Sequence, residues 1–191
     1  MARGRLEAFS DGVIAIIITI MVLEVRVPHG DDWEALRPVL PVFLTYVLSF
    51  VYVGIYWNNH HHMLCLVDRI TGRILWANLH LLFWMSLIPF ATAWMGQNQF
   101  APVPTAVYGS VLLAAAFGFM ILQHVIITSQ GTSSRLAAAV GRDRKARLSA
   151  ALYLAAIPLA FVNQWASDAI YVTVAIMWFV PDPRIEATLR A

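Results

Sequence analysis

The chain has 191 residues, of which 60% are hydrophobic and only 13% are charged. A soluble domain of this length normally carries about twice that share of charge, so the composition indicates an integral membrane protein. The formal net charge of +2 gives no indication of nucleic-acid binding, and the one cysteine, Cys65, excludes an internal disulfide.

Six apolar segments predict six transmembrane helices, so the expected fold is an all-α integral membrane protein with one domain. The segments span residues 6–27, 38–64, 73–96, 101–128, 147–165 and 168–181. No Lys, Arg, Asp or Glu occurs between Ile74 and Ser134, and the polar, proline-containing stretch 97–104 divides this long run into two helices. The sixth segment has a short uncharged run that stops at Pro181.

The first segment begins with charged and polar residues and then runs without charge from Gly12 to Leu23. At about 100° per residue, a helix here places a mostly apolar set of side chains on one arc about 100° wide. The arc contains Phe9, Gly12, Ile16, Thr19, Ile20 and Leu23. Asp11 falls about 140° from Ile16 around the same helix. We interpret these two faces as one that packs on protein, with Asp11, and one that lines a pore, with Ile16.

Four motifs lie in the first half of the chain. They are Arg5-x-x-x-Phe9-Ser10-Asp11-Gly12, Tyr56-Trp57-x-Asn59-His60-His61, Leu75-Trp76-x-Asn78-Leu79 and Pro89-Phe90-x-Thr92-Ala93. Together they resemble the transmembrane protein 175 family, the lysosomal-type potassium channels and their bacterial relatives. The resemblance covers about residues 3–97, and the second half resembles the family only in hydropathy and number of helices. It implies a homotetramer in which four first helices line a central pore.

The basic residues predict the orientation in the bilayer. If the N-terminus is inside the cell, Arg26 and Arg37 are the only basic residues outside, so eleven of the 13 lie inside. This asymmetry indicates that both termini are cytoplasmic, and we expect a multi-pass protein of the bacterial plasma membrane. The basic run 142–147 is most simply an anchor of this orientation, with contact to anionic lipids as the alternative.

A polar cluster is expected where the first three helices meet near the cytoplasm. Asp11 and Asn78 fall at a similar depth to His60 and His61, and ionisable groups inside a membrane are usually paired. We predict that Asp11 hydrogen-bonds to His60 or His61, that Asn78 or Trp57 completes the cluster, and that it locks the first helix. The family resemblance adds other members to this lock, and its full set is Arg5, Phe9, Ser10, Asp11, Trp57, His60, His61 and Asn78. The alternative is that Ser10 and Asp11 only cap the helix.

Other chemistry finds little support in the sequence. Consecutive helical residues diverge by about 100°, so His60, His61 and His62 cannot converge on one metal ion, although one of them could titrate near neutral pH and bias gating. Signatures of hydrolases, P-loop proteins and dinucleotide-binding enzymes are absent, as is the T-V-G-Y-G filter of ordinary potassium channels. We therefore expect no enzymatic activity, no metal site and no cofactor beyond permeant potassium ions.

The apolar arc is the best candidate for the element that selects ions. Matched to the family, Ile16 falls at its isoleucine/leucine constriction and Thr19 at its threonine level, with Ile20 and Leu23 as further rings. We expect a potassium-permeable cation channel with a hydrophobic constriction, whose partners are potassium ions, the lipid bilayer and identical subunits. The alternatives are a proton-conducting channel of the same architecture, in which Thr19 and trapped water carry protons, and a non-conducting membrane scaffold. A membrane enzyme is a more distant possibility.

Overall fold

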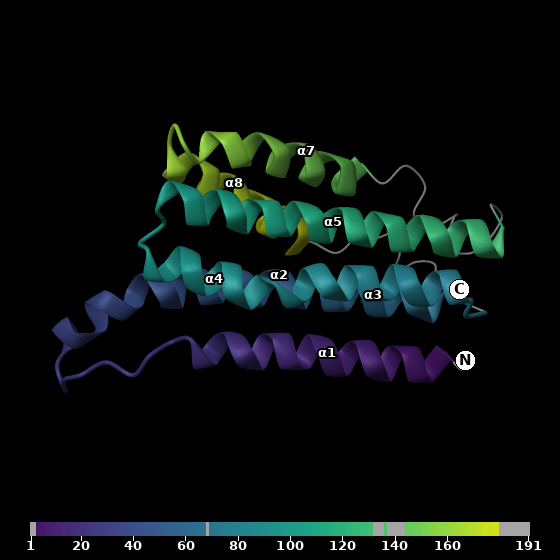
Figure 1. Ribbon diagram of the computed structural model, residues 1–191, viewed down its shortest axis with the longest axis horizontal. Coiled ribbons are helices and arrows are strands. Elements are labelled where there is room, and N and C mark those ends of the chain that lie inside the picture. Colours follow the sequence, from purple (N-terminus) through teal and green to yellow (C-terminus); the bar gives the residue numbers. More distant parts are fainter. Residues whose placement is uncertain (1–2, 68, 132–135, 137–143, 180–191) are drawn as a thin grey trace.

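The computed structural model describes residues 3–67, 69–131, 136 and 144–179, and the described residues are all-helical, with no strand. The elements in chain order are α1 (Arg3–Leu23), the 3-10 helix η1 (Trp33–Val39), α2 (Leu40–Cys65), α3 (Gly72–Ser86), α4 (Ile88–Gln97), α5 (Pro102–Gln130), α7 (Arg144–Leu159) and α8 (Gln164–Phe179). Figure 1 shows α1 along one side of the bundle and α7 along the opposite side, with α3 and α4 end to end between α1 and α5.

These elements can be grouped into six membrane helices. Four stretches are long and apolar enough to cross a bilayer, namely Arg3–Leu23, Trp33–Cys65, Gly72–Gln97 and Pro102–Gln130. The other two are α7 and α8, with 16 residues each, which pack against each other and against α5. Such short helices cross a bilayer only where their ends lie in the interface or against protein.

Prolines and caps set the ends of several helices. The third segment bends at Leu87, where α3 ends and α4 begins, because Pro89 has no N–H with which to continue the hydrogen-bond ladder. Thr71 caps α3 by accepting a hydrogen bond from the Ile74 N–H at 3.4 Å. At the start of η1, Asp32 caps in the same way and accepts from the Ala35 N–H at 3.0 Å.

Three of the expected helix boundaries are wrong, one of them the start of the sixth helix, which is Gln164 instead of residue 168. The first helix ends at Leu23 instead of residue 27, because Glu24 and the residues after it leave the apolar run. The fifth ends at Leu159, just after Pro158, instead of residue 165. Residues 164 and 165 belong to α8, whose start is capped by Asn163 through a 3.2 Å hydrogen bond from the Ala166 N–H. Residues 180 and 181 of the expected sixth span, and residues 142 and 143 of the basic run, lie outside the described residues.

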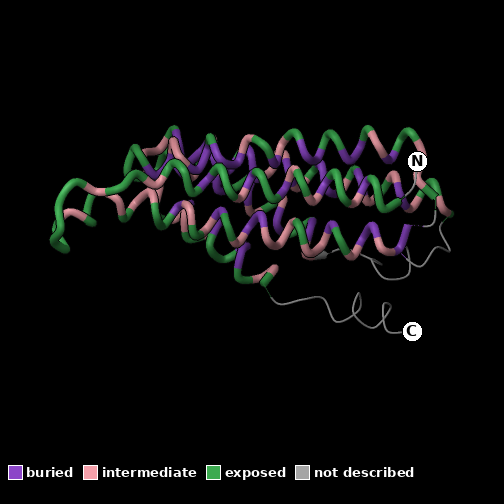
Figure 2. Tube along the Cα trace, turned by 90° about the horizontal axis from the view of Figure 1, so that it is seen from below, coloured by how far each residue is buried: buried purple, intermediate pink, exposed green. Residues whose placement is uncertain are grey.

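The core is built from interlocking helix faces with small residues at close approaches. Along each helix buried and exposed positions alternate, as Figure 2 shows, and α1 is buried on one side only. At Gly96 of α4, an added Cβ would lie 2.7 Å from the Cα of Val42, so α2 and α4 are in direct backbone contact there. At Gly109 of α5, the added atom would collide with the hydroxyl of Tyr171, so this glycine makes room for a buried aromatic ring of α8.

Candidate functional site

The two faces of α1 have different surroundings. The side chains of Leu6, Ser10, Ile14, Ile17 and Met21 are buried, and α1 packs against α2, α3 and α4. The opposite face is exposed in the single chain, with Ile16 at 57%, Ile20 at 44% and Leu23 at 78% exposure. Thr19 and Phe9 lie on the same exposed face. We call Ile16, Thr19, Ile20 and Leu23 the apolar stripe.

A buried hydrogen-bond chain ties α1 to α3 and α2. The amide of Asn78 on α3 donates to Ser10 Oγ on α1 at 2.9 Å. Its carbonyl oxygen lies 2.7 Å from His60 Nε2 on α2, so this ring nitrogen carries the proton and donates. All three side chains are at most 1% exposed, and no water competes for these bonds. We call Ser10, His60 and Asn78 the anchor cluster.

Asp11 has a different partner from the one expected. Its Oδ1 accepts a 3.0 Å hydrogen bond from the indole N–H of Trp57, and the prediction of a bond to His60 or His61 is wrong. His60 turns inward to Asn78, whereas His61 stacks on the Trp57 ring with centroids 6.1 Å apart. Asp11 is one residue beyond Ser10, which places it about 100° further around α1, on the side of Trp57.

The capping alternative for Ser10 and Asp11 is also wrong, because α1 begins at Arg3 and both residues lie well inside the helix. Arg5 and Phe9 are exposed and stand outside the anchor cluster, and no hydrogen bond or ion pair of Arg5 is found in the described part of the chain. Their expected membership of the lock therefore has no support in this geometry. They lie on the face of α1 that carries the apolar stripe.

Sequence reasoning missed Arg3, which ties the start of α1 to the end of α2. Its guanidinium donates to the carbonyl of Cys65 at the end of α2 at 3.0 Å and pairs with Glu7 at 3.4 Å. The i, i+4 spacing of Arg3 and Glu7 was a readable signal, since such pairs face each other on a helix. The sequence has no signal for the contact to Cys65, because every residue has a backbone carbonyl.

A second polar group lies deeper in the bundle and was also missed. The Thr92 hydroxyl donates to the Ile88 carbonyl at 2.7 Å, so the 2.6 Å contact with Ser49 is a bond that Ser49 donates. The hydroxyl of Tyr108 then donates to Ser49 at 3.0 Å. Tyr171 donates to the Thr105 carbonyl at 3.2 Å. We call Ser49, Thr92, Tyr108 and Tyr171 the hydroxyl cluster, which joins α2, α4, α5 and α8.

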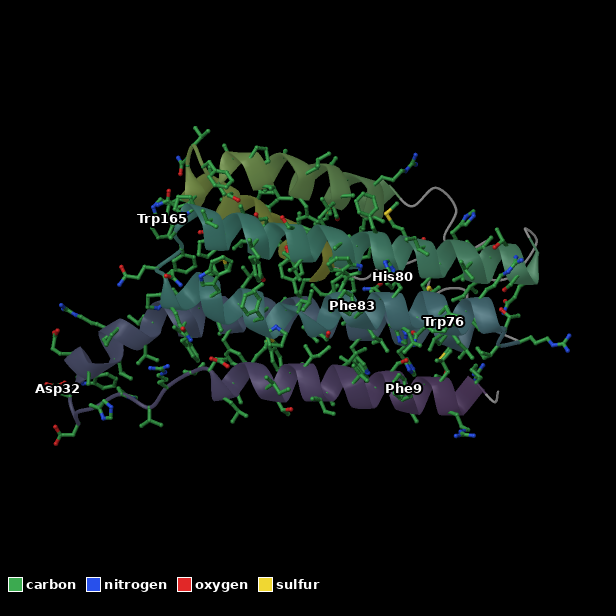
Figure 3. All side chains as sticks on the ribbon, viewed as in Figure 1. Phe9, Asp32, Trp76, His80, Phe83 and Trp165 are labelled. Atoms are coloured by element: carbon green, nitrogen blue, oxygen red, sulfur yellow. The ribbon has the colours of Figure 1, made fainter. Side chains whose placement is uncertain are left out.

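The positions of labelled side chains agree with this arrangement. Figure 3 shows Phe9 on α1 and Trp76 on α3 toward the end where α1 begins, and Asp32 and Trp165 toward the opposite end. Among the described residues, no group of three or more His, Cys, Asp or Glu side chains is placed to hold a metal ion. The candidate site is α1, a helix that is fixed by hydrogen bonds on one face and is uncovered on the other.

Comparison with known proteins places this arrangement in a family. The model of a family described as the endosomal/lysosomal potassium channel TMEM175 matches residues 5–89, which contain α1 from Arg5 onward, the anchor cluster and the apolar stripe. A protein of Chryseobacterium sp. (strain P1-3) named as a potassium channel is 51% identical over 190 residues, covering 100% of this chain and 99% of that protein. This chain belongs to the TMEM175 family. It is a bacterial-type member and a multi-pass membrane protein.

Two further TMEM175 relatives differ in length and in name. The crystal structure of a lysosomal potassium-selective channel TMEM175 homolog from Chamaesiphon minutus superposes with a TM-score of 0.76 at 31% identity, covering 92% of this chain and 95% of that one. The bovine protein named as the endosomal/lysosomal proton channel TMEM175 is 31% identical over 181 residues, which cover 84% of this chain but 37% of the bovine protein. Because it covers 92% of this chain, the superposition extends well beyond residue 89, where the match to the family model ends.

Proposed function

We propose that the protein is a potassium-permeable cation channel. Its functional unit is a homotetramer, because one α1 per subunit cannot enclose a pore and several copies around an axis can. The supporting observation is the uncovered apolar stripe on a helix whose other face is buried and hydrogen-bonded. The names of the Chryseobacterium and Chamaesiphon relatives agree with potassium as the permeant ion. The proposal requires no enzymatic step and no bound cofactor.

The apolar stripe is the proposed constriction. In a symmetric tetramer Ile16, Ile20 and Leu23 each form a ring, and a narrow apolar ring closes a pore by expelling water. Thr19 supplies oxygen ligands between these rings. Its hydroxyl proton is donated to the Ile16 carbonyl at 3.0 Å, which leaves the lone pairs of the hydroxyl oxygen free to face a partly dehydrated cation.

The anchor cluster holds the constriction in position in this proposal. Since α1 is covered on one side only, the buried bonds of Ser10 through Asn78 to His60 fix its depth and rotation. The subunit lies in the bacterial plasma membrane with both termini in the cytoplasm, an orientation supported by the distribution of basic residues. Labelling of a single cysteine at position 144 by a membrane-impermeant thiol reagent tests this orientation. Strong labelling from outside intact cells contradicts it.

Reversal potentials of the purified protein in bilayers test the constriction. Ile16→Asn widens and wets the ring and should raise conductance while weakening the preference for potassium over sodium. Thr19→Val keeps the shape but removes the oxygen, and should reduce that preference while leaving assembly intact. Leu154→Asn is the matched control, because Leu154 is a 64% exposed apolar residue on α7, away from α1. If both α1 variants keep wild-type current and selectivity, α1 does not line the pore.

Proton conduction through the same pore is the second candidate, and the name of the bovine relative favours it. Protons would pass along water held at the Thr19 ring. Currents in opposed potassium and pH gradients separate the two candidates, because the reversal potential follows the gradient of the permeant ion. A protein without ion flux in proteoliposomes would be a scaffold.

A further inference from the structure

Charged side chains stand at both ends of the apolar stripe. Glu24 follows Leu23 directly and is exposed, and its N–H still bonds to the Met21 carbonyl at 3.3 Å, so the backbone continues the last turn of α1. At the other end Arg5 lies about 20° from Ile16 when α1 is viewed along its axis, and it is exposed too. The apolar stripe therefore lies between a negative and a positive charge.

Glu24 is held on the side of α1 that faces α4, at the edge of the uncovered face. Gln97, the last residue of α4, donates from Nε2 to Glu24 Oε2 at 3.4 Å. Glu24 also lines a groove of about 770 Å³ between α1 and α4, together with Ile16 and Ile20 of the stripe. One opening thus contains the carboxylate and two residues of the proposed constriction. The bond to Gln97 uses one carboxylate oxygen, and the other is left for water or a passing cation.

We propose that Glu24 forms a ring of carboxylates at the outer mouth of the pore, and that this ring concentrates hydrated monovalent cations ahead of the apolar constriction. The inference rests on the proposed function, because it requires four copies of α1 around one axis. Clefts lined by one sign of charge raise the local concentration of counter-ions, and rings of Asp or Glu serve this purpose in cation channels. In this proposal the Glu24 ring acts on the entry of cations, whereas the selection of potassium is assigned to Thr19.

The charges around the ring favour a directional effect. Arg26 lies beyond the end of α1, is exposed and reduces the local negative potential, whereas Arg37 is paired with Glu34 at 3.1 Å on η1. At the inner mouth, Arg5 repels cations. Potassium is therefore enriched outside and depleted inside the constriction, so inward current should exceed outward current in symmetric potassium.

The test is current through excised patches in symmetric potassium chloride at two ionic strengths. Glu24→Gln should lower inward current about two- to five-fold at 0.05 M salt, where charges act over more than about 10 Å, and should have little effect at 1 M, where the range is about 3 Å. Glu24→Asp keeps the charge and should retain most of the current. Arg5→Gln should act in the opposite sense and raise outward current. Glu34→Gln, which removes the same charge on η1, should change neither direction.

Three results overturn the inference. One is an unchanged current in Glu24→Gln while Ile16→Asn changes conductance, which leaves the proposed function intact. The second is an equal loss at both ionic strengths, which a structural defect would give and a field would not. The third is an effect of Glu34→Gln as large as that of Glu24→Gln. The current would then depend on the total charge of the outer side and not on the position of Glu24. If Ile16→Asn and Thr19→Val also leave current and selectivity unchanged, the proposed pore along α1 is wrong. The proposed carboxylate ring is then wrong with it.

Discussion

The anchor cluster and the hydroxyl cluster are both buried, but they hold the molecule together in different ways. The anchor cluster joins α1 to α2 and α3 through the side chains of Ser10, His60 and Asn78 alone. In the hydroxyl cluster, Tyr171 of α8 donates to the backbone carbonyl of Thr105 on α5, whereas Thr92 donates to the Ile88 carbonyl of its own helix. A bond to a carbonyl survives changes of side chain in the partner helix, whereas a bond between two side chains is lost when either is replaced.

The difference follows from how each helix is covered. α1 packs against α2, α3 and α4 on one face and is uncovered on the other, so the polar bonds on the packed face should decide its depth and rotation. The helices joined by the hydroxyl cluster are also held by close packing, as at Gly109 and at Gly96. The anchor cluster should therefore control the position of α1, and the hydroxyl cluster should add to a core that is already tight. The predictions below test this contrast.

The largest effect is expected from Asn78→Leu. The substitution leaves Ser10 and His60 unpaired in the interior, at a cost of about 1–3 kcal/mol for each buried group. The fraction of tetramer in size-exclusion chromatography and the melting temperature in detergent should both fall. Asn59→Leu is the matched control, because the amide of Asn59 donates to the Ile55 carbonyl of its own helix. Equal losses in the two variants would contradict a special role for the anchor cluster.

Gly109→Ala should be next and should act on the other cluster. The new Cβ would meet the Tyr171 hydroxyl and, at 2.7 Å, the Cζ of the same ring, which is fully buried. Overpacking of this kind costs about 1–3 kcal/mol and should also break the bond from Tyr171 to the Thr105 carbonyl. Thermal unfolding in detergent measures the loss. Gly54→Ala has no atom within 4 Å of the added Cβ and should unfold at or slightly above the wild-type temperature.

These two clusters also show which contacts could be predicted from the sequence and which could not. Ser10, His60 and Asn78 could be grouped because they stand in short motifs at the same depth on three successive helices. The partner of Asp11 could not be predicted, because Trp57 lies only about 40° from His61 and about 60° from His60 around the same helix. The room that Gly109 makes for Tyr171 depends on how α5 and α8 cross, and 62 residues of sequence separate the two positions.

The helix boundaries show the same limit. Hydropathy predicted six segments, and the described residues supply a helix for each of them. It could not place the turn between α7 and α8, because residues 160–163 are nearly as apolar as the helices and the signal for a new helix is the Asn163 cap. In the third segment, which was expected to be one helix, the break falls at Leu87, two residues before Pro89.

Thr92→Val should have a smaller effect than Gly109→Ala. Valine keeps the shape of threonine but removes the oxygen that accepts from Ser49, and one unpaired buried hydroxyl costs about 1 kcal/mol or more. The melting temperature should fall by a few degrees, with tetramer fraction and ion preference unchanged. Thr173→Val is the control, because Thr173 is exposed and its hydroxyl bonds to the Ala169 carbonyl of its own helix. A loss of tetramer in Thr92→Val would show that the two clusters are coupled.

The smallest effect concerns the bond from Trp57 to Asp11. Trp57 is 44% exposed, so water can replace either partner, and we expect a coupling of about 0.5–1.5 kcal/mol. A double-mutant cycle of Asp11→Ala and Trp57→Phe on the melting temperature measures it, and phenylalanine keeps a ring for His61 to stack on. Replacing Trp57→Phe by Trp76→Phe gives the control cycle, since Trp76 is a 76% exposed indole on α3.

Asp11→Ala should therefore lower the tetramer fraction slightly or shift gating, and should not change ion preference. The reason is its position, because Asp11 faces Trp57 and lies about 140° from the Ile16 side of α1. Bi-ionic reversal potentials of potassium against sodium decide the point. A change of selectivity with normal assembly would place the carboxylate in the pore. It would then be Asp11, and not the apolar stripe, that cations meet at the inner half of α1.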